Sequence, residues 1–134
     1  MANSVEEAVY NYLNADSDIT DEFSAVYWSE ATAPTFPYLV FWLVDDAGTD
    51  STLNYRKQGE ARIQFDIWDD ATPSGMARGV RLRSLVADKI RDTSETVSGY
   101  HIITTGNTEQ TIRRESGTEP HHFVVDGVIQ WRKE

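Results

Sequence analysis

Two pairs of aspartates are the first residues in this sequence whose types and spacing could do chemistry. Asp45-Asp46 follows the apolar run from Tyr38 to Val44, and Asp69-Asp70 follows the alternating stretch "ARIQFDIW". Carboxylates at strand ends can hold Mg²⁺ or Ca²⁺, which prefer oxygen ligands. With Glu60 and Arg62 nearby in the sequence, the pattern would allow a metal-dependent nuclease or phosphodiesterase that uses Asp45, Asp46 and Asp69.

The same aspartates also have a purely structural interpretation. Acids commonly end strands and begin helices, where they satisfy backbone N–H groups. A nuclease of this kind usually needs a lysine or a similar group to activate water. Beside Glu60 the chain offers only Arg62, which stays protonated in proteins. The structural interpretation is therefore favoured, and the metal-dependent nuclease is kept as the alternative.

Other classes of catalytic site have no anchor in the sequence. There is no cysteine, no G-x-S-x-G stretch and no glycine-rich phosphate-binding motif. The adjacent His121 and His122 would point to opposite faces of a strand, which is poor geometry for holding one metal together. The sequence therefore predicts no catalytic residue, no metal and no cofactor.

Composition limits the partners that the chain can have. Its 134 residues suit one domain, residues 1–134, and 40% of them are hydrophobic. Acids outnumber bases by 22 to 12, for a net charge of −10, so duplex DNA would repel the chain. The run from Tyr38 to Val44 is too short to span a bilayer as a helix, and the N-terminus lacks a signal-peptide pattern. We expect a soluble, cytoplasmic protein that can lie near DNA without retaining it.

Helix starts are the clearest structural signals. Asn3 or Ser4 can cap a first helix that has acids in its first turn, and Thr72 followed by Pro73 predicts a second helix that runs to about Thr93. The apolar residues expected to face inward on this second helix are Met76, Val80, Val86 and Ile90. Alternating segments between and after the helices predict strands, so the expected fold class is α+β, a mostly antiparallel sheet with two main helices packed on one face.

The strand from Tyr38 to Val44 is apolar on both faces, whereas an exposed antiparallel strand alternates with polar residues. The strand ending in Trp68 carries an arginine, an amide and an acid on its second face. Two helices cover only one side of a sheet, so something else must cover the other side. A neighbouring subunit is one candidate, and the alternative is a larger core or loops of the same chain folded over the sheet.

Two polar segments are candidate contacts with other proteins. Arg78 and Arg81 neighbour each other on the predicted helix, and the stretch from Asp45 to Gly59 makes a long loop of a hairpin. An ordinary solvated helix face is the alternative for the arginines. Charge reversal at Arg78 and Arg81 is expected to weaken assembly and leave the monomer folded. The candidate residues of a subunit or partner interface are Asp45, Asp46, Tyr55, Arg56, Lys57, Trp68, Arg78 and Arg81.

The order of these segments resembles a known family. The aromatic strand "FPYLVFWLVDD", the strand "GEARIQFDIWDD", the helix "GMARGVRLRSLVADKI" and the final strand "HHFVVDGVIQW" look like those of the tail-completion proteins of long-tailed bacteriophages. This group includes tail terminators and tail-to-head joining proteins. The likeness covers nearly the whole chain, and none of its motifs is a catalytic fingerprint.

The resemblance implies a non-enzymatic structural subunit of the virion, which passes through the host cytoplasm during assembly. Such subunits form a ring, here expected to be a hexamer, at the head-proximal end of the tail. The ring stops growth of the tail tube or joins the tail to the head connector. The implied partners are further copies of the chain, the tail tube protein and the head-side connector, with DNA passing through the lumen unbound and no contact with a membrane.

Overall fold

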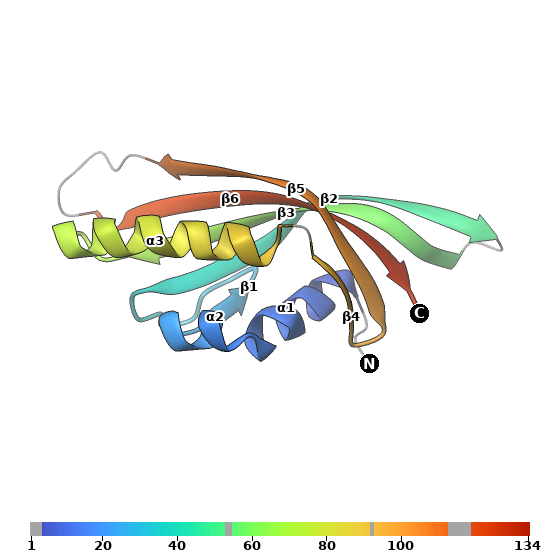
Figure 1. The fold of residues 1–134 in the computed structure, drawn as a ribbon, viewed down its shortest axis with the longest axis horizontal. Coiled ribbons are helices and arrows are strands. Elements are labelled where there is room, and N and C mark those ends of the chain that lie inside the picture. The colour runs from blue at the N-terminus through green and yellow to red at the C-terminus, as the bar shows by residue number, and fades with distance from the viewer. Residues whose placement is uncertain (1–3, 53–54, 92, 113–118) are drawn as a thin grey trace.

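The computed structural model describes residues 4–52, 55–91, 93–112 and 119–134, with the side chains of residues 46–52, 55–57, 105, 111 and 112 left undescribed. The described residues form three helices and six strands, which are labelled in Figure 1. In chain order they are α1 (Val5–Ala15), α2 (Ser17–Glu22), β1 (Val26–Trp28), β2 (Tyr38–Thr52), β3 (Tyr55–Asp69), α3 (Pro73–Lys89), β4 (Ser94–Val97), β5 (Tyr100–Ile112) and β6 (His121–Lys133).

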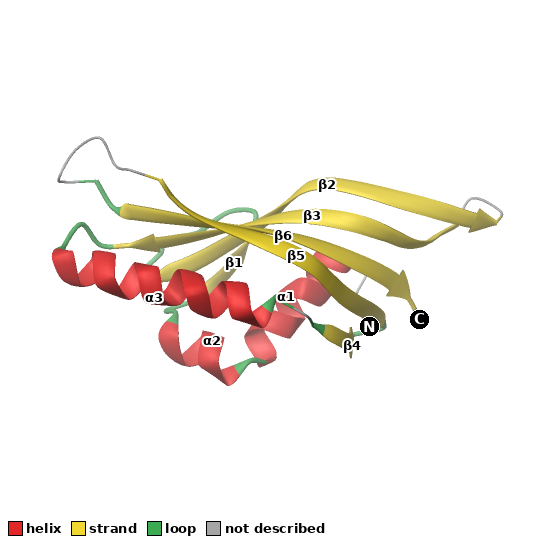
Figure 2. Ribbon diagram, turned by 45° about the horizontal axis from the view of Figure 1, so that its top comes forward, coloured by secondary structure: helices red, strands yellow, loops and turns green. Residues whose placement is uncertain are grey.

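The strands form one sheet in the order β1-β2-β3-β6-β5-β4. Only the short β1 runs parallel to its neighbour, and every other pair is antiparallel. A mixed fold with a mostly antiparallel sheet was predicted, but the described chain has three helices where two main ones were expected. Figure 2 shows the twisted sheet with the helices beneath it. None of these helices is long and apolar enough to cross a membrane.

The helices begin where local sequence signals place them. The Ser4 side chain accepts a hydrogen bond from the Glu7 N–H at 3.1 Å, and Thr72 accepts one from the Gly75 N–H at 2.9 Å, with Pro73 in the first turn. Each cap satisfies a backbone N–H that has no partner within the helix. Helix α3 ends at Lys89, four residues before the predicted Thr93, and the strand β4 begins at Ser94.

The core lies between the helices and one face of the sheet. Its largest fully buried side chains include Phe41, Phe65 and Phe123, from three adjacent strands. Helix α3 approaches β6 closely because Gly79 has no side chain, and a Cβ there would lie 2.0 Å from the Phe123 ring. Buried residues of α3 therefore include Gly75, Gly79, Leu82, Val86 and Ala87.

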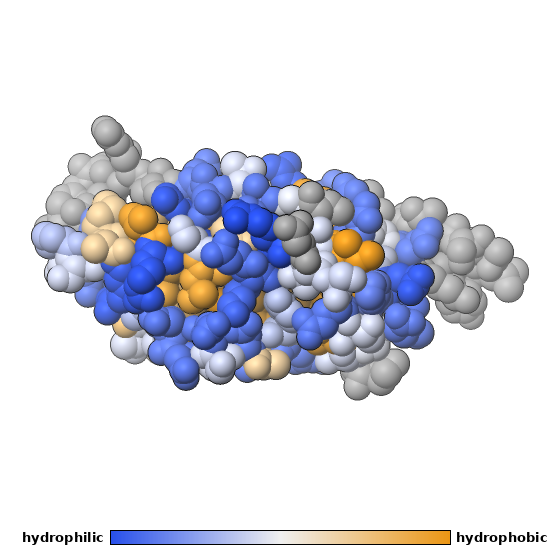
Figure 3. Space-filling view, in the orientation of Figure 1, coloured by the Kyte–Doolittle hydropathy of each residue, from blue (hydrophilic) through white to orange (hydrophobic). Residues whose placement is uncertain are grey.

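Two residues expected to face the core from α3 do not. Met76 and Val80 are 38% and 39% exposed, whereas Val86 and Ile90 are buried as predicted. In the first half of the helix the contact line runs through Gly75 and Gly79, so Met76 and Val80 in the same turns lie to the side. Figure 3 shows apolar patches among the hydrophilic surface on the side that Figure 1 presents.

The predicted loop from Asp45 to Gly59 is instead a continuation of two strands. Pairing between β2 and β3 runs from Tyr38 opposite Trp68 to Thr52 opposite Tyr55, with register shifts along the way. Asp45 and Asp46 therefore lie within a strand and do not end one. Figure 1 shows β2 and β3 projecting together past the helices. We call the segment from Asp45 to Gly59 the arm.

Candidate interaction site on the open sheet face

The alternation in β3 divides its side chains between the core and the opposite side of the sheet. Ala61, Ile63, Phe65 and Ile67 are fully buried in the core. The intervening residues point to the side away from the helices, which we call the open face. From strand register, its members near the middle of the sheet are Tyr38, Val40 and Trp42 of β2, Gln64, Asp66 and Trp68 of β3, and His122 and Val124 of β6.

Asp66 is the centre of a hydrogen-bond network on the open face. The Trp42 Nε1–H donates to Asp66 Oδ2 at 2.9 Å, and the Gln64 amide donates to Oδ1 at 2.9 Å. The Nε2 atom of His122 lies 2.8 Å from Oδ1. Burial by itself raises the pKa of Asp66, but the hydrogen bonds from His122, Gln64 and Trp42 leave this pKa below its usual value. The network links side chains from three neighbouring strands around one carboxylate.

A row of stacked rings crosses the same face. Trp68 stacks on His122 with the ring centroids 3.9 Å apart and the planes at 5°, and Tyr38 lies on the other side of Trp68 at 6.5 Å. Phe36 continues the row beyond Tyr38, at 5.7 Å. Strand pairing places Tyr38, Trp68 and His122 directly opposite one another. Phe36 and Trp42 each remain 39% exposed, so the open face presents aromatic surface to its surroundings.

An open groove of about 700 Å³ adjoins this cluster where the short strand β1 ends. Its lining includes Trp42, Trp68 and Asp66 of the open face and Glu30, which follows β1. Glu6, from the first turn of α1, also lines it. All the charged residues of this lining are acidic, so the groove combines aromatic rings with negative charge.

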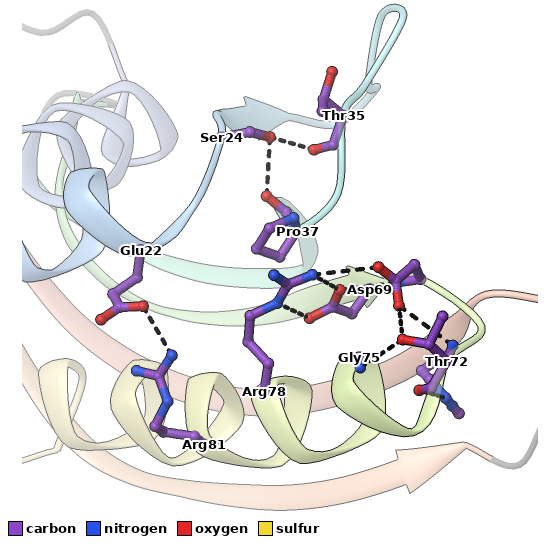
Figure 4. Close-up of polar contacts among 11 residues, drawn as sticks. Glu22, Ser24, Thr35, Pro37, Asp69, Thr72, Gly75, Arg78 and Arg81 are labelled. Atoms are coloured by element: carbon purple, nitrogen blue, oxygen red, sulfur yellow. Dashed lines mark hydrogen bonds and ion pairs between the residues drawn. The ribbon is translucent and has the colours of Figure 1, made fainter.

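The aspartates that follow β3 have a structural role. Asp69 is fully buried and accepts hydrogen bonds from the Nε (2.7 Å) and Nη2 atoms of Arg78, and also from the Asp70 N–H at 2.8 Å. Asp70 in turn accepts a hydrogen bond from the Thr72 hydroxyl, which contributes most to lowering the pKa of Asp70. Figure 4 shows how these contacts join the end of β3 to the start of α3.

The nuclease alternative gains no geometric support. The carboxylate of Asp69 already has a counter-charge, and Asp45 is an exposed residue within β2. Among the described residues there is no group of three histidines, aspartates or glutamates that could hold a metal ion. His121 is buried with Nε2 3.0 Å from the Thr72 carbonyl oxygen, on the opposite side of β6 from His122. The two histidines thus face opposite ways, as predicted.

The predicted interface residues fall in three places. Trp68 belongs to the row of rings on the open face, and Asp45 lies exposed at the base of the arm. Arg81 projects from α3 and donates to Glu22 at 2.9 Å, and this contact raises the pKa of Arg81 and lowers that of Glu22. Arg78 points to Asp69 instead. The side chains of Asp46, Tyr55, Arg56 and Lys57 lie outside the described residues.

Sequence reasoning missed the network around Asp66. The two-residue spacing of Gln64, Asp66 and Trp68 places them on one face of a strand. This spacing could have predicted the part of the network that β3 supplies. Trp42 and His122 come from other strands, and only the register of the sheet brings them to the carboxylate.

Comparison with known proteins identifies a shared fold and no family. No family model and no curated protein matches the chain. One similar solved chain, which carries no functional name, has 13% identity and a TM-score of 0.59, with 97% of this chain and 90% of that chain covered. Another belongs to the virion of a native gene transfer agent particle, with 18% identity, a TM-score of 0.57 and coverage of 98% and 95%. The protein therefore has the fold of a chain found in a virion particle.

Proposed function

We propose that this chain is a structural virion protein that forms a ring at the head-proximal end of a phage tail. The observation that carries the proposal is its full-length likeness in fold to a chain of the gene transfer agent virion. The arrangement of the sequence segments, which resembles tail-completion proteins, supports the position in the tail. The ring ends growth of the tail tube or joins the tail to the head connector.

The arm and helix α3 are suited to the contact between neighbouring subunits. In a closed ring each subunit uses one surface to contact a different surface of the next. The arm projects from the body and carries Asp45 and Asp46, and α3 presents Arg81, which is 56% exposed. Exposed Met76 and Val80 add apolar surface on the same helix. In the proposed ring, a hexamer, the arm of one subunit docks on α3 of the next.

The remaining partners follow from this position. The tail tube protein lies on one side of the ring and the head-side connector on the other. DNA passes through the lumen without specific binding, because a subunit with a net charge of −10 repels phosphate. We propose no catalytic role and no cofactor for this single domain.

Immunogold labelling of purified virions that contain the chain tests the placement. Label is expected at the junction of head and tail, once per particle. Label along the tail shaft, on the head shell or absent from the particle would overturn the proposed position.

Charge reversal at Arg81 tests the subunit contact. Arg81→Glu removes an exposed ion pair with Glu22, which contributes little to folding, so the variant is expected to fold and to lose ring formation. Arg91→Glu is the matched control, because Arg91 is also exposed and paired with a nearby acid, Asp88. Native mass spectrometry and negative-stain images should show rings for the control and single subunits for Arg81→Glu. Equal assembly of the two variants would contradict the contact.

A further inference from the structure

The groove beside Trp42 coincides with an unpaired strand edge. Strand β1 has only three residues and pairs with Leu39, Val40 and Phe41 of β2. The Leu39 N–H donates to the Ala25 carbonyl at 3.2 Å, and the Phe41 carbonyl accepts from the Ser29 N–H at 2.8 Å. By the alternation of strand hydrogen bonding, the N–H and C=O of Leu43 point to the same edge. Within the described residues no strand pairs with that edge beyond Phe41.

The side chains around this edge are apolar and aromatic. Trp42 is 39% exposed and Val44 is 43% exposed. An exposed apolar strand edge readily accepts another strand, and soluble proteins usually protect such edges with lysine, proline or a covering loop. Between Trp42 and Asp45 the sequence has no lysine and no proline, and a register shift follows Leu43 in the pairing of β2 with β3. The backbone and the side chains thus both favour the addition of an extended segment.

The charges at the edge select the segment. Glu6 and Glu30 line the groove, and neither has an ion pair within the described part of the chain. Trp42 lines the same groove and is 39% exposed, whereas Trp68 is stacked between His122 and Tyr38. A cation is attracted both by carboxylates and by the faces of aromatic rings, and most strongly by tryptophan. An arginine or lysine side chain therefore fits the groove, whereas an acidic side chain is repelled.

We propose that the outer edge of β2 next to this groove binds an extended, cationic segment of a different protein by strand addition. The segment hydrogen-bonds to the backbone of β2 beyond Phe41 and places an arginine or lysine against Trp42 and Glu30. A second copy of this chain is the competing occupant, and the native mass of the Glu30→Gln variant described below distinguishes it from a different protein. The proposed partner is a basic protein or a protein with a basic extended arm.

A synthetic peptide tests the proposal on the isolated chain. The probe is a blocked nine-residue peptide of alternating threonine and valine with arginine at the centre, and its comparison peptide has glutamate there. Isothermal titration should show that the arginine peptide binds at least about ten-fold more tightly. Amide hydrogen exchange should show slower exchange of the Leu43 N–H when the arginine peptide is bound. Equal binding of the two peptides, no binding of either, or an unprotected Leu43 amide would overturn the proposal.

Two substitutions locate the binding site. Glu30→Gln removes one groove charge from an exposed position and should weaken binding of the arginine peptide by about three-fold. Glu95→Gln is the matched control, because Glu95 is an exposed acid on β4 at the opposite edge of the sheet. If Glu30→Gln lowers the native mass of the protein without peptide, the edge is occupied by a second copy and the proposal is wrong. Peptide binding does not require a ring. A negative peptide result therefore leaves the proposed virion role untouched, and failure of the virion role leaves the peptide result untouched.

Discussion

Asp69 depends on Arg78 for its counter-charge, because its carboxylate is fully buried at the end of β3. Such a pair is costly to break from one side, since the remaining charge stays buried without compensation. Because of this contact, a charge-reversal variant of Arg78 cannot test assembly separately from folding. Charge reversal there would place a carboxylate against Asp69, so the expectation that the reversed monomer stays folded now applies to Arg81 alone.

Truncation of Arg78 is the first prediction. Arg78→Ala should lower the free energy of unfolding by about 2 kcal/mol, because it removes charge-assisted hydrogen bonds to a buried carboxylate. Arg78→Lys keeps the charge but loses the paired geometry of the guanidinium, so its effect should be smaller. Urea denaturation measures both. An alanine variant as stable as the wild type would show that the Asp69 carboxylate needs no counter-charge.

The lowered pKa of Asp66 leads to a prediction of how the free energy of unfolding changes in acid. Its pKa is lower in the folded chain than in an ordinary carboxyl, so the folded state favours the ionised form. The resulting stabilisation is fully present above the ordinary value, near pH 4, and is lost as the pH falls through the lower folded pKa. Asp66→Asn should therefore be less stable than wild type at pH 7, with the difference shrinking below about pH 4.

Unfolding curves from pH 7 to pH 2 measure this difference. The matched control is Asp126→Asn, since Asp126 lies on the same face opposite Gln64 and has no hydrogen bond to its side chain among the described contacts. A stability difference for Asp66→Asn that stays constant across this pH range would count against the hydrogen-bonded carboxylate.

At the scale of elements, the sequence predicted structure that depends on residues close together in the chain. It did not predict structure that depends on pairing between distant segments. The start of α3 needs only Thr72, Pro73 and one turn of backbone, so the sequence predicts it. The arm was misread as a loop because "DDAGTDS" is rich in turn residues. Backbone pairing overrides that preference, since β2 and β3 stay paired past Gly48 opposite Gly59, although the register shifts along the way.

The candidate site was only half predictable for the same reason. Alternation assigns Gln64, Asp66 and Trp68 to one face, and that assignment depends on β3 alone. The stack of Trp68 on His122 joins residues 54 positions apart in the sequence, because β6 pairs directly with β3. Helical periodicity likewise selected Met76 and Val80 as inward residues, and it could not foresee that small residues would form the contact line.

The close approach of α3 to β6 gives the next prediction. Gly79→Ala should destabilise the protein by about 1–3 kcal/mol, although alanine favours helix more than glycine does, because the new methyl group overlaps the Phe123 ring. Thermal unfolding measures the change. Gly106→Ala is the matched control, since a Cβ at Gly106 meets no atom within 4 Å. If the overlap is the cause, Phe123→Leu should recover part of the stability lost in Gly79→Ala.

For the whole molecule, the acid excess predicts behaviour toward DNA. With 22 acids and 12 bases, neither the single subunit nor the assembled ring should retain duplex DNA at physiological salt. A mobility-shift titration with a labelled duplex checks this for both forms. Retention that weakens steeply with added salt would reveal a basic surface and would contradict an inert channel wall.

The strand order has a consequence for biosynthesis. β6 comes last in sequence among the six described strands, but it lies between β3 and β5 in the middle of the sheet. Until residues 121–133 leave the ribosome, the N-terminal strands and the β4–β5 hairpin have no ladder to connect them. These two groups of strands are therefore joined only after β6 has been made, and a premature stop before His121 would yield two unjoined pieces of sheet for proteases to remove.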